Sequence, residues 1–564
     1  MANVVGISAL DKESTVTLVQ DGVITWAVSE ERLTRVKQQR GFPWGALEMV
    51  FERSGVGPGD VEAVCYPFLP APEELALRRR RAREHNRENE NKDGPANRLF
   101  HRLNLFRELR RDRRGVLPFS DRELAAGLAK WGLAGKLHRY PHEPVHAANA
   151  FYTSGFSRAL AVVFDAYGSG DTGGVYRCGP DGIEQLAAFP WPNSLGDFYS
   201  RVTKALGFTP DRHEGKILGL AAYAPAGEVF DLVRPRFEVG GGRFFYINSH
   251  DPFYVPRLAR RFPREKVAAA HQDTLEEVAV GVVRPYLRST GERDVVLSGG
   301  VTANVKLNQR IAELPEVDRI FVHPAMSDMG TGTGAAYLYL AERGRARPYK
   351  LPHALLGPDY TDAECRAALE EAGLAYTEPA DLVGEAARLL ADGKVVAWFD
   401  GRMEYGPRAL GSRSVLARAT DPEINRWLNN RLKRTEFMPF APVTLPEHAE
   451  RCYIGLEKCR HTAEFMTVTV DCTAYMREVS PAAVHVDGTA RPQIANRDAT
   501  PRYHDVLARY HELTGIPSLI NTSFNIHEEP IVCTPADAVR AFRQGHLDYL
   551  ALGPCLVKNP ADDA

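Results

Sequence analysis

Two apolar runs near residue 300 each end in a glycine-rich turn that leads into a helical pattern, and this repeat restricts the fold more than any other feature. In DVVLSGGVTANVKLNQRIAEL (residues 294–314) the run ends at Ser298, Gly299 and Gly300. In IFVHPAMSDMGTGTGAAYLYLAE (residues 320–342) it is followed by Asp328 and alternating glycines. A strand, a glycine turn and a helix N-terminus in series are typical of α/β proteins that bind anions or nucleotides at strand ends. The pattern therefore predicts an α/β fold with a site at these turns.

A third apolar run, ALAVVF (residues 159–164), predicts a buried strand that ends at Asp165 and another glycine-rich turn. Just before it, HEPVH places His142 and His146 four residues apart, on one face of a predicted helix. The spacing alone leaves two interpretations open: a capped or core histidine pair, or two ligands of a metal ion.

Length and composition limit the classes of protein to consider. A chain of 564 residues exceeds one hydrophobic core and predicts several domains. The formal charge of -2 provides no overall field that would favour nucleic acid or an anionic membrane. The N-terminal residues do not resemble a signal peptide, and no window approaches the length of a membrane span. Eight scattered cysteines without a CxxC pair predict reduced thiols, so we expect a cytoplasmic protein.

Residues 78–114 differ from the rest of the chain because Arg and Lys strongly outnumber Asp and Glu. The segment reads as a basic helical insertion with a turn at residues 93–95. Three interpretations remain open: a solvated helical hairpin, a lid over an anionic ligand, or a weak contact with nucleic acid.

The second half of the chain contains a loop in which arginines alternate with glycines. GRMEYGPRALGSRS (residues 401–414) includes Arg402, Arg408 and Arg413. Glycines and a proline restrict such a loop, and several guanidinium groups can then donate hydrogen bonds to one anion. The segments TEFMPFAP, HVDGTARPQ and NTSFN follow in that order.

These motifs carry a family resemblance that covers nearly the whole chain. HEPVH, FDAYGSGD, SGGVTAN and SDMGTGTGAA resemble the Kae1/TsaD branch of the actin-like ATPase superfamily. The order of the later motifs resembles the C-terminal half of the NodU/CmcH family of O-carbamoyltransferases, which has a YrdC/Sua5-like fold. The chain is identified as a member of that family. The resemblance implies a Kae1-like carbamoyl-transfer domain over residues 1–350 and a YrdC-like, carbamoyl-adenylate-forming α/β domain over residues 351–564.

The resemblance implies a two-step reaction with ATP. Carbamoyl phosphate is hydrolysed to carbamate, which attacks ATP to give carbamoyl adenylate and pyrophosphate in the YrdC-like domain. A hydroxyl of the acceptor then takes the carbamoyl group in the Kae1-like domain, and AMP leaves. AMP is a good leaving group, whereas carbamate alone is a poor acylating agent. The implied partners are carbamoyl phosphate, ATP and a small hydroxylated acceptor such as an antibiotic or a sugar derivative, and a homodimer is left open.

Site residues follow by matching motifs. In the YrdC-like half, Arg408, Arg413, Lys433 and Arg491 would bind phosphate oxygens, and Asn521 and Ser523 would act as neutral donors. The alternative is that the basic residues form structural ion pairs with Glu404, Glu436 and Asp487. In the Kae1-like half, the four expected ligands of a divalent ion are His142, His146, Asp165 and Asp328. Their mixed N/O donor set favours iron or another first-row ion, with Mg²⁺ accompanying ATP. Residues expected to contact the nucleotide are Lys37, Lys216, Gly299, Gly300 and Asn304.

The chain departs from the family pattern at two short motifs. Lys12, Glu13 and Ser14 occupy the place where the family usually has a histidine and an aspartate, so either Lys12 or another group would accept the proton of the acceptor hydroxyl, or the acceptor is different. Phe437, Met438 and Pro439 occupy the place of a segment that often contains arginine, which removes one cation from the phosphate cluster.

Three rival functions come from other classes. A sugar-kinase-like or chaperone-like ATPase would leave the C-terminal motifs without a role. A tRNA threonylcarbamoylation enzyme would bind RNA, which the near-neutral charge disfavours. The third rival is a non-catalytic binding protein of the same fold.

Overall fold

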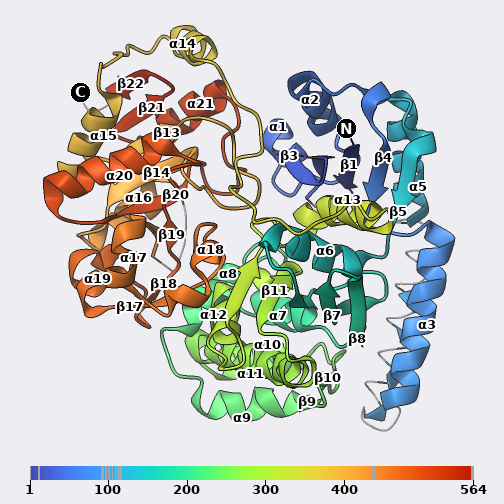
Figure 1. Ribbon diagram of the computed structural model, residues 1–564. Helices are drawn as coiled ribbons and strands as arrows, with labels where there is room; N and C mark the ends of the chain where they lie inside the picture. Colours follow the sequence, from blue (N-terminus) through green and yellow to red (C-terminus); the bar gives the residue numbers. More distant parts are fainter. Residues whose placement is uncertain are drawn as a thin grey trace. The chain divides into compact units, whose positions relative to one another are not determined.

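The computed structural model describes residues 2–9, 13–89, 117–433 and 439–560, together with 94, 95, 98, 99, 102, 103, 106, 107 and 110 (Figure 1). Lys12, Glu436, Phe437 and Met438, which carry sequence predictions, lie outside the described residues. The chain forms two compact units. The first unit comprises residues 1–25, 40–44 and 54–351, and the second comprises residues 26–39, 45–53 and 352–564.

The first unit contains two five-stranded sheets with the same strand order. One runs β3-β2-β1-β4-β5, and the other, read from its opposite edge, runs β8-β7-β6-β11-β12. In each sheet the first three strands along the chain lie in reverse order, and the fourth and fifth strands follow beside the first. In both sheets the fourth strand is parallel to the first. The strands are β1 (Asn3–Ser8), β2 (Thr15–Gln20), β3 (Val23–Ser29), β4 (Ala63–Tyr66), β5 (Leu137–Arg139), β6 (Ala159–Phe164), β7 (Asp171–Gly179), β8 (Gly182–Pro190), β11 (Asp294–Ser298) and β12 (Arg319–Val322). The last four residues of β3, 26–29, group with the second unit. The predicted α/β class is confirmed.

Helices α6 (His142–Ser154) and α13 (Thr331–Glu342) pack closely against each other and against the sheets. A Cβ atom at Gly334 would clash with the carbonyl oxygen of Val145, so glycine allows α13 to approach α6. The further helices of this unit are α5 (Leu117–Lys130), α7 (Leu195–Ala205), α8 (Glu214–Ala221), α9 (Phe230–Val233), α10 (Tyr254–Arg261), α11 (Arg264–Thr290) and α12 (Val305–Ala312), and β9 (Phe237–Gly240) pairs with β10 (Arg243–Tyr246).

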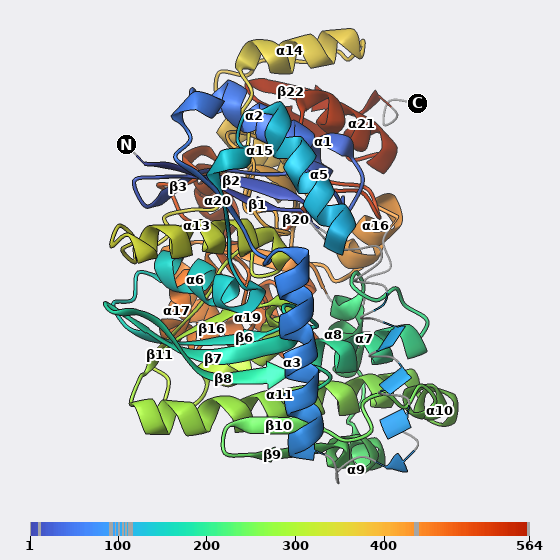
Figure 2. The ribbon, with the colours of Figure 1, turned by 90° about the vertical axis from the view of Figure 1, so that its right-hand side faces the viewer.

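Helix α3 (Ala71–Asn89) includes the start of the basic insertion and is the long blue helix of Figure 2. Glu74, Arg78, Ala82 and His85 recur at helical spacing, and all four are buried. One face of this part of the segment is therefore buried, whereas Arg79, Arg80 and Arg83 on the other face are exposed. Burial of the polar groups on the first face requires partners from other elements, which the isolated sequence of α3 does not reveal.

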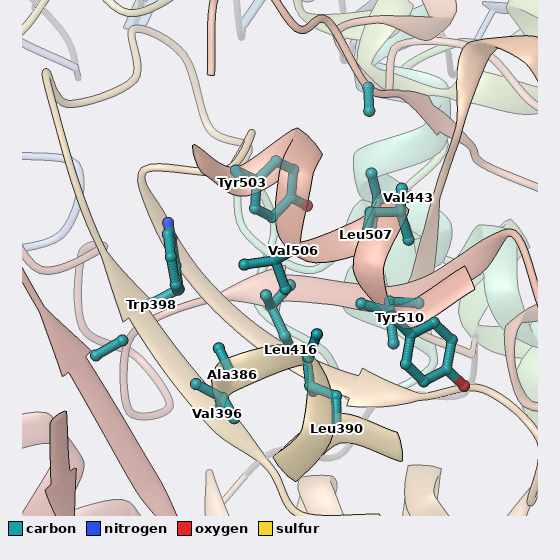
Figure 3. Close-up of a cluster of buried hydrophobic side chains, with 14 of the residues drawn as sticks. Ala386, Leu390, Val396, Trp398, Leu416, Val443, Tyr503, Val506, Leu507 and Tyr510 are labelled. Atoms are coloured by element: carbon teal, nitrogen blue, oxygen red, sulfur yellow. The ribbon is translucent and has the colours of Figure 1, made fainter. Parts of the chain in front are cut away.

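The second unit is built on a seven-stranded sheet of order β19-β15-β20-β14-β13-β21-β22. Its strands are β13 (Val396–Phe399), β14 (Arg413–Arg418), β15 (Ala441–Thr444), β19 (Gln493–Ile494), β20 (Ser518–Ser523), β21 (Tyr549–Leu552) and β22 (Cys555–Lys558). Helices α15 (Leu382–Ala391) and α20 (Pro501–Thr514) pack on it through the buried cluster around Trp398, Leu416 and Tyr503 (Figure 3).

Shorter elements complete the second unit. They are α1 (Glu30–Thr34), α2 (Trp44–Ser54), α14 (Asp362–Glu371), α16 (Glu423–Arg431), α17 (Ala449–Cys452), α18 (Arg460–Ala463), α19 (Ala474–Val479), α21 (Pro535–Gly545), and the small sheet of β16 (Tyr453–Ile454), β17 (Val470–Cys472) and β18 (Thr489–Ala490). All eight cysteines are buried as free thiols, as predicted. Within the described part of the chain, no helix has the length and apolarity needed to cross a membrane.

Candidate functional site

Four predicted ligands converge in the first unit. His142 and His146 come from the first two turns of α6, Asp165 follows β6 directly, and Asp328 precedes α13. One donor atom from each residue lies within 4.8 Å of the others. The Nε2 atoms of the two histidines are 3.1 Å apart, and each is 3.3 Å from Oδ2 of Asp165. Oδ1 of Asp328 is 3.4 Å from His142 Nε2 and 3.5 Å from His146 Nε2.

These separations fit a single ion at the centre of the four donors. Donors about 2.1 Å from a metal lie about 3.0 Å apart in octahedral and about 3.4 Å apart in tetrahedral geometry. Two imidazole nitrogens with two carboxylate oxygens form a donor set that suits first-row divalent ions.

The surrounding backbone fixes which carboxylate oxygen of Asp165 faces the histidines. Its Oδ1 accepts hydrogen bonds from the backbone N–H groups of Ala166, at 2.8 Å, and Gly300, at 3.1 Å. Oδ2 is thereby directed toward the two imidazoles. His146 is oriented in turn by Ser298, whose Oγ lies 3.2 Å from Nδ1. Protein metal sites usually contain such further groups, which hydrogen-bond to a metal ligand and orient it.

The two histidines and the two carboxylates shift one another's pKa values. Burial lowers the pKa of His142, but the hydrogen bonds and charges of Asp165 and Asp328 outweigh it and raise that pKa well above its ordinary value. The pKa of His146 is also raised, by the same two carboxylates against burial. Burial raises the pKa of Asp165 and of Asp328, and the two histidines reverse this, so both carboxyl pKa values are lowered. The site therefore concentrates two carboxylate charges that attract a cation.

Helix α3 clamps the turn that carries Asp165, a connection that sequence reasoning missed. Ser169 Oγ accepts from the backbone N–H of His142, at 3.1 Å, and donates to Oε2 of Glu74, at 3.1 Å. The Ser169 N–H donates to Oε1 of Glu143, at 2.8 Å. Glu74 is fully buried and pairs with Arg78, at 3.1 Å. Arg81 extends the clamp to Asp171, at 3.0 Å. The only sequence signal was the polar stripe at helical spacing on α3.

The residues expected to contact nucleotide in the first unit have local structural contacts. Gly299 has a φ of 95°, and a Cβ there would clash with the carbonyl of Phe164. Asn304 caps α12 by accepting from the Leu307 N–H, at 3.1 Å. Lys216 is buried on α8. Their contact with a nucleotide stays a prediction.

In the second unit, Glu404 organises the arginine-rich loop. Its Oε1 accepts from the backbone N–H groups of Leu410, Ser412 and Arg413, at 2.9, 2.8 and 3.0 Å. Glu404 Oε1 thus binds the loop backbone, whereas the alternative from the sequence expected Glu404 to form an ion pair with a basic side chain.

Arg413 is fully buried, with its guanidinium 3.6 Å from the centre of the Phe399 ring. Nη1 donates to backbone carbonyls, including that of Gly401 at 2.9 Å, whereas Nε and Nη2 have no hydrogen-bond partner among the described residues. Burial lowers the pKa of Arg413, and the nearby Glu404 charge opposes this. Guanidinium donors without a protein partner are able to bind an anionic ligand.

The other predicted residues of this unit occupy separate loops and strands. Asn521, on β20, donates to the carbonyl of Ala409, at 3.1 Å, and to Oε1 of Gln493, at 2.7 Å. Gln493, which sequence reasoning did not select, donates to the carbonyl of Leu410 at 2.8 Å. Both side chains therefore hold the arginine-rich loop.

The remaining residues are placed as follows: Ser523 ends β20, Arg408 lies in the arginine-rich loop, Arg491 lies between β18 and β19, Lys433 follows α16 with a φ of 55°, and Lys37 belongs to the second unit.

Comparison with known proteins identifies the family. Residues 3–337 match the carbamoyltransferase N-terminus, and residues 387–559 match the carbamoyltransferase C-terminus. The chain is 31% identical to nodulation protein NolNO of Sinorhizobium fredii, over 97% of this chain and 79% of that protein. It is 36% identical to nodulation protein NolO of Bradyrhizobium diazoefficiens, over 74% of this chain and 79% of that protein.

Among solved structures, full-length HypF in its phosphate- and nucleotide-bound form overlays with a TM-score of 0.36 and 11% identity, covering 60% of this chain and 55% of that chain, a likeness too distant to identify a fold. The two matched regions lie in the order expected from the sequence motifs and together span most of the chain. The chain belongs to the carbamoyltransferase family and is a carbamoyltransferase enzyme.

Proposed function

We propose that this enzyme is an ATP-dependent O-carbamoyltransferase that uses carbamoyl phosphate and forms carbamoyl adenylate. Water first cleaves carbamoyl phosphate to carbamate and phosphate. A carbamate oxygen then attacks the α-phosphorus of ATP, and pyrophosphate leaves. The hydroxyl oxygen of a small acceptor attacks the carbonyl carbon of the adenylate, the hydroxyl loses its proton, and AMP leaves with the electrons of the broken C–O bond.

We assign adenylate formation to the part of the chain that follows residue 350. The arginine-rich loop supports this assignment, because Glu404, Asn521 and Gln493 fix its backbone, and Nε and Nη2 of Arg413 have no hydrogen-bond partner among the described residues. A guanidinium held in this way binds phosphate oxygens in a defined orientation and with little reorganisation. Arg408, Lys433 and Arg491 would supply further positive charge for carbamoyl phosphate and ATP.

We assign carbamoyl transfer to residues 1–350, where His142, His146, Asp165 and Asp328 would hold one divalent ion, with iron as the expected metal. The ion would act as a Lewis acid toward the carbonyl or phosphate oxygens of the adenylate. The surrounding residues set its position: Ser298 orients His146, and the N–H groups of Ala166 and Gly300 orient Asp165. The turn Gly299–Gly300 and the start of α12 would receive the nucleotide, and Lys12 stays the predicted base for the acceptor hydroxyl.

The observation that carries the proposal is the coexistence of the four-donor cluster and the arginine-rich loop in one chain that matches both carbamoyltransferase regions. The test is exchange of labelled pyrophosphate into ATP, measured with and without carbamoyl phosphate. We expect exchange only when carbamoyl phosphate is present. Equal exchange without it would exclude the adenylate route. Incubation with hydroxylated sugars and antibiotics, followed by mass spectrometry, would then identify the acceptor from the mass gain of one carbamoyl group.

A further inference from the structure

A short N-terminal segment folds as part of the second unit. Residues 26–39 lie within the region that matches the carbamoyltransferase N-terminus, yet they group with residues 352–564. This segment contains α1, a five-residue helix over Glu30–Thr34, which ends at Arg35 in the left-handed conformation with a φ of 63°. The position of α1 in the sequence therefore does not indicate the unit in which it functions.

Arg35 binds the loop that follows β20. Its Nη1 donates to the carbonyl of Ile531, at 2.7 Å, and its Nη2 to the carbonyl of Pro530, at 2.6 Å. Nε lies 3.5 Å from Oδ1 of Asp537, whose other oxygen accepts from the N–H groups of Cys533 and Thr534. The guanidinium therefore joins two consecutive carbonyls to the carboxylate that holds the start of α21.

The other side of α1 contacts the arginine-rich loop. Arg32 is buried, and its Nη2 donates to the carbonyl of Gly406 at 2.8 Å. Between the two arginines, Leu33 packs against the buried cluster of Met403, Ala409, Ile531 and Cys533, which includes residues of both loops. One helical turn thus contacts both loops at once.

Hydrogen bonds continue from these contacts to Arg413. The Val532 N–H donates to the carbonyl of Phe524, at 3.0 Å, and the Phe524 N–H donates to the carbonyl of Arg413, at 3.0 Å. The residue after Arg413 pairs with Ser523 across β14 and β20. A displacement of the loop at Pro530 and Ile531 would therefore be transmitted to the backbone that carries the buried guanidinium.

We propose that α1 is a positioning element of the adenylate-forming site, in which Arg35 and Arg32 hold the loop after β20 and the arginine-rich loop in a fixed relation. This inference rests on the proposed function, because it assigns the role to a site where carbamoyl phosphate and ATP react. A positional error of about 1 Å in groups that orient a substrate can reduce a rate about 100-fold.

The test is carbamoyl-phosphate-dependent exchange of pyrophosphate into ATP by the full-length variant Arg35→Ala. We expect kcat/KM for exchange to fall about 100-fold, with partial recovery when guanidinium ion is added. Arg35→Lys is expected to regain less of the exchange rate than added guanidinium ion does, because one ammonium group cannot reproduce the planar fork that reaches both carbonyls. The matched control is Arg53→Ala, which removes a half-exposed arginine of the same unit that pairs with Glu364 at 3.2 Å. It should exchange at the wild-type rate.

Two further measurements separate the outcomes. Titration with Co²⁺ at the four-donor cluster of the first unit should be unchanged in Arg35→Ala, which distinguishes a local displacement from global unfolding. If Arg35→Ala unfolds, the milder Arg32→Lys variant replaces it, and we expect a smaller loss of exchange. Wild-type enzyme without carbamoyl-phosphate-dependent exchange would overturn the proposed function itself. Active wild-type enzyme together with folded, fully active Arg35→Ala and Arg32→Lys would overturn only the positioning role.

Discussion

The Nε2 atoms of His142 and His146 lie 3.1 Å apart and face the same two carboxylates. Two imidazoles on successive turns of α6 therefore converge on the same position beside Asp165 and Asp328. The four donors belong to the first unit, whereas the arginine-rich loop belongs to the second.

Replacement of either histidine should uncouple the two steps. In His142→Ala or His146→Ala we expect carbamoyl transfer to be lost, because the ion loses a ligand, while carbamoyl-phosphate-dependent pyrophosphate exchange persists. Both reactions are measured on the same preparation. The control is His504→Ala, which replaces a histidine of the second unit on α20. A parallel loss of both reactions in the α6 variants would contradict two separate sites.

Above about pH 6.5, where the histidine contribution is lost, stability and metal binding should depend on pH in opposite directions. In the metal-free protein the raised pKa values of His142 and His146 stabilise the fold below about pH 6.5, and this contribution is lost as the pH rises through the raised values. The lowered pKa values of Asp165 and Asp328 stabilise the fold above about pH 4, and this contribution is lost as acid protonates them.

A bound metal requires neutral imidazoles, so its affinity should increase with pH. We therefore expect the rise in melting temperature on addition of Co²⁺ to grow from about pH 6 to about pH 8. The measurement compares thermal unfolding in chelator and in Co²⁺ at each pH. A metal-induced shift that is the same at every pH would argue against the two histidines as ligands.

Removal of the Ser169 hydroxyl should weaken metal binding without removing a ligand. Ser169 Oγ links the backbone N–H of His142 to the buried carboxylate of Glu74. Loss of a group that orients a metal ligand typically reduces affinity about 10- to 100-fold. We expect Ser169→Ala to fall in this range in a Co²⁺ titration followed by visible absorbance. Ser289→Ala, an exposed serine on α11, is the matched control. Equal affinities in both variants would show that the clamp from α3 is not transmitted to the site.

A methyl group at Gly334 should disturb the packing of α13 on α6. The added Cβ would meet the carbonyl of Val145, which lies in the turn between the two histidines. Overpacking of this kind costs about 1–3 kcal/mol, so we expect a lower melting temperature and weaker Co²⁺ binding in Gly334→Ala. Gly215→Ala is the control, since no atom lies within 4 Å of its added Cβ. A neutral effect of Gly334→Ala would mean that the two helices adjust freely.

Local sequence patterns were sufficient to predict the strand, turn and helix that carry the site. The strand β6, the turn after it and the helix that carries HEPVH follow from residue spacing, since helices and strands have fixed periods. The motifs were also sufficient for the family, because they lie within residues 3–337 and 387–559, which match the two carbamoyltransferase regions. The identities of the four donors were likewise available from the sequence.

Tertiary structure decided what these residues contact. Asp328 lies far along the chain from His146, yet its carboxylate oxygen is 3.5 Å from the imidazole because β12 and α13 bring it there. The charged residues of α3 looked solvated because their partners, Ser169 and Asp171, belong to another element. Residues 26–39 join the second unit through contacts such as the hydrogen bond from Arg35 to the carbonyl of Ile531, 496 positions away. Periodicity and residue type describe a segment by itself, whereas burial and orientation depend on the surfaces that folding brings against it.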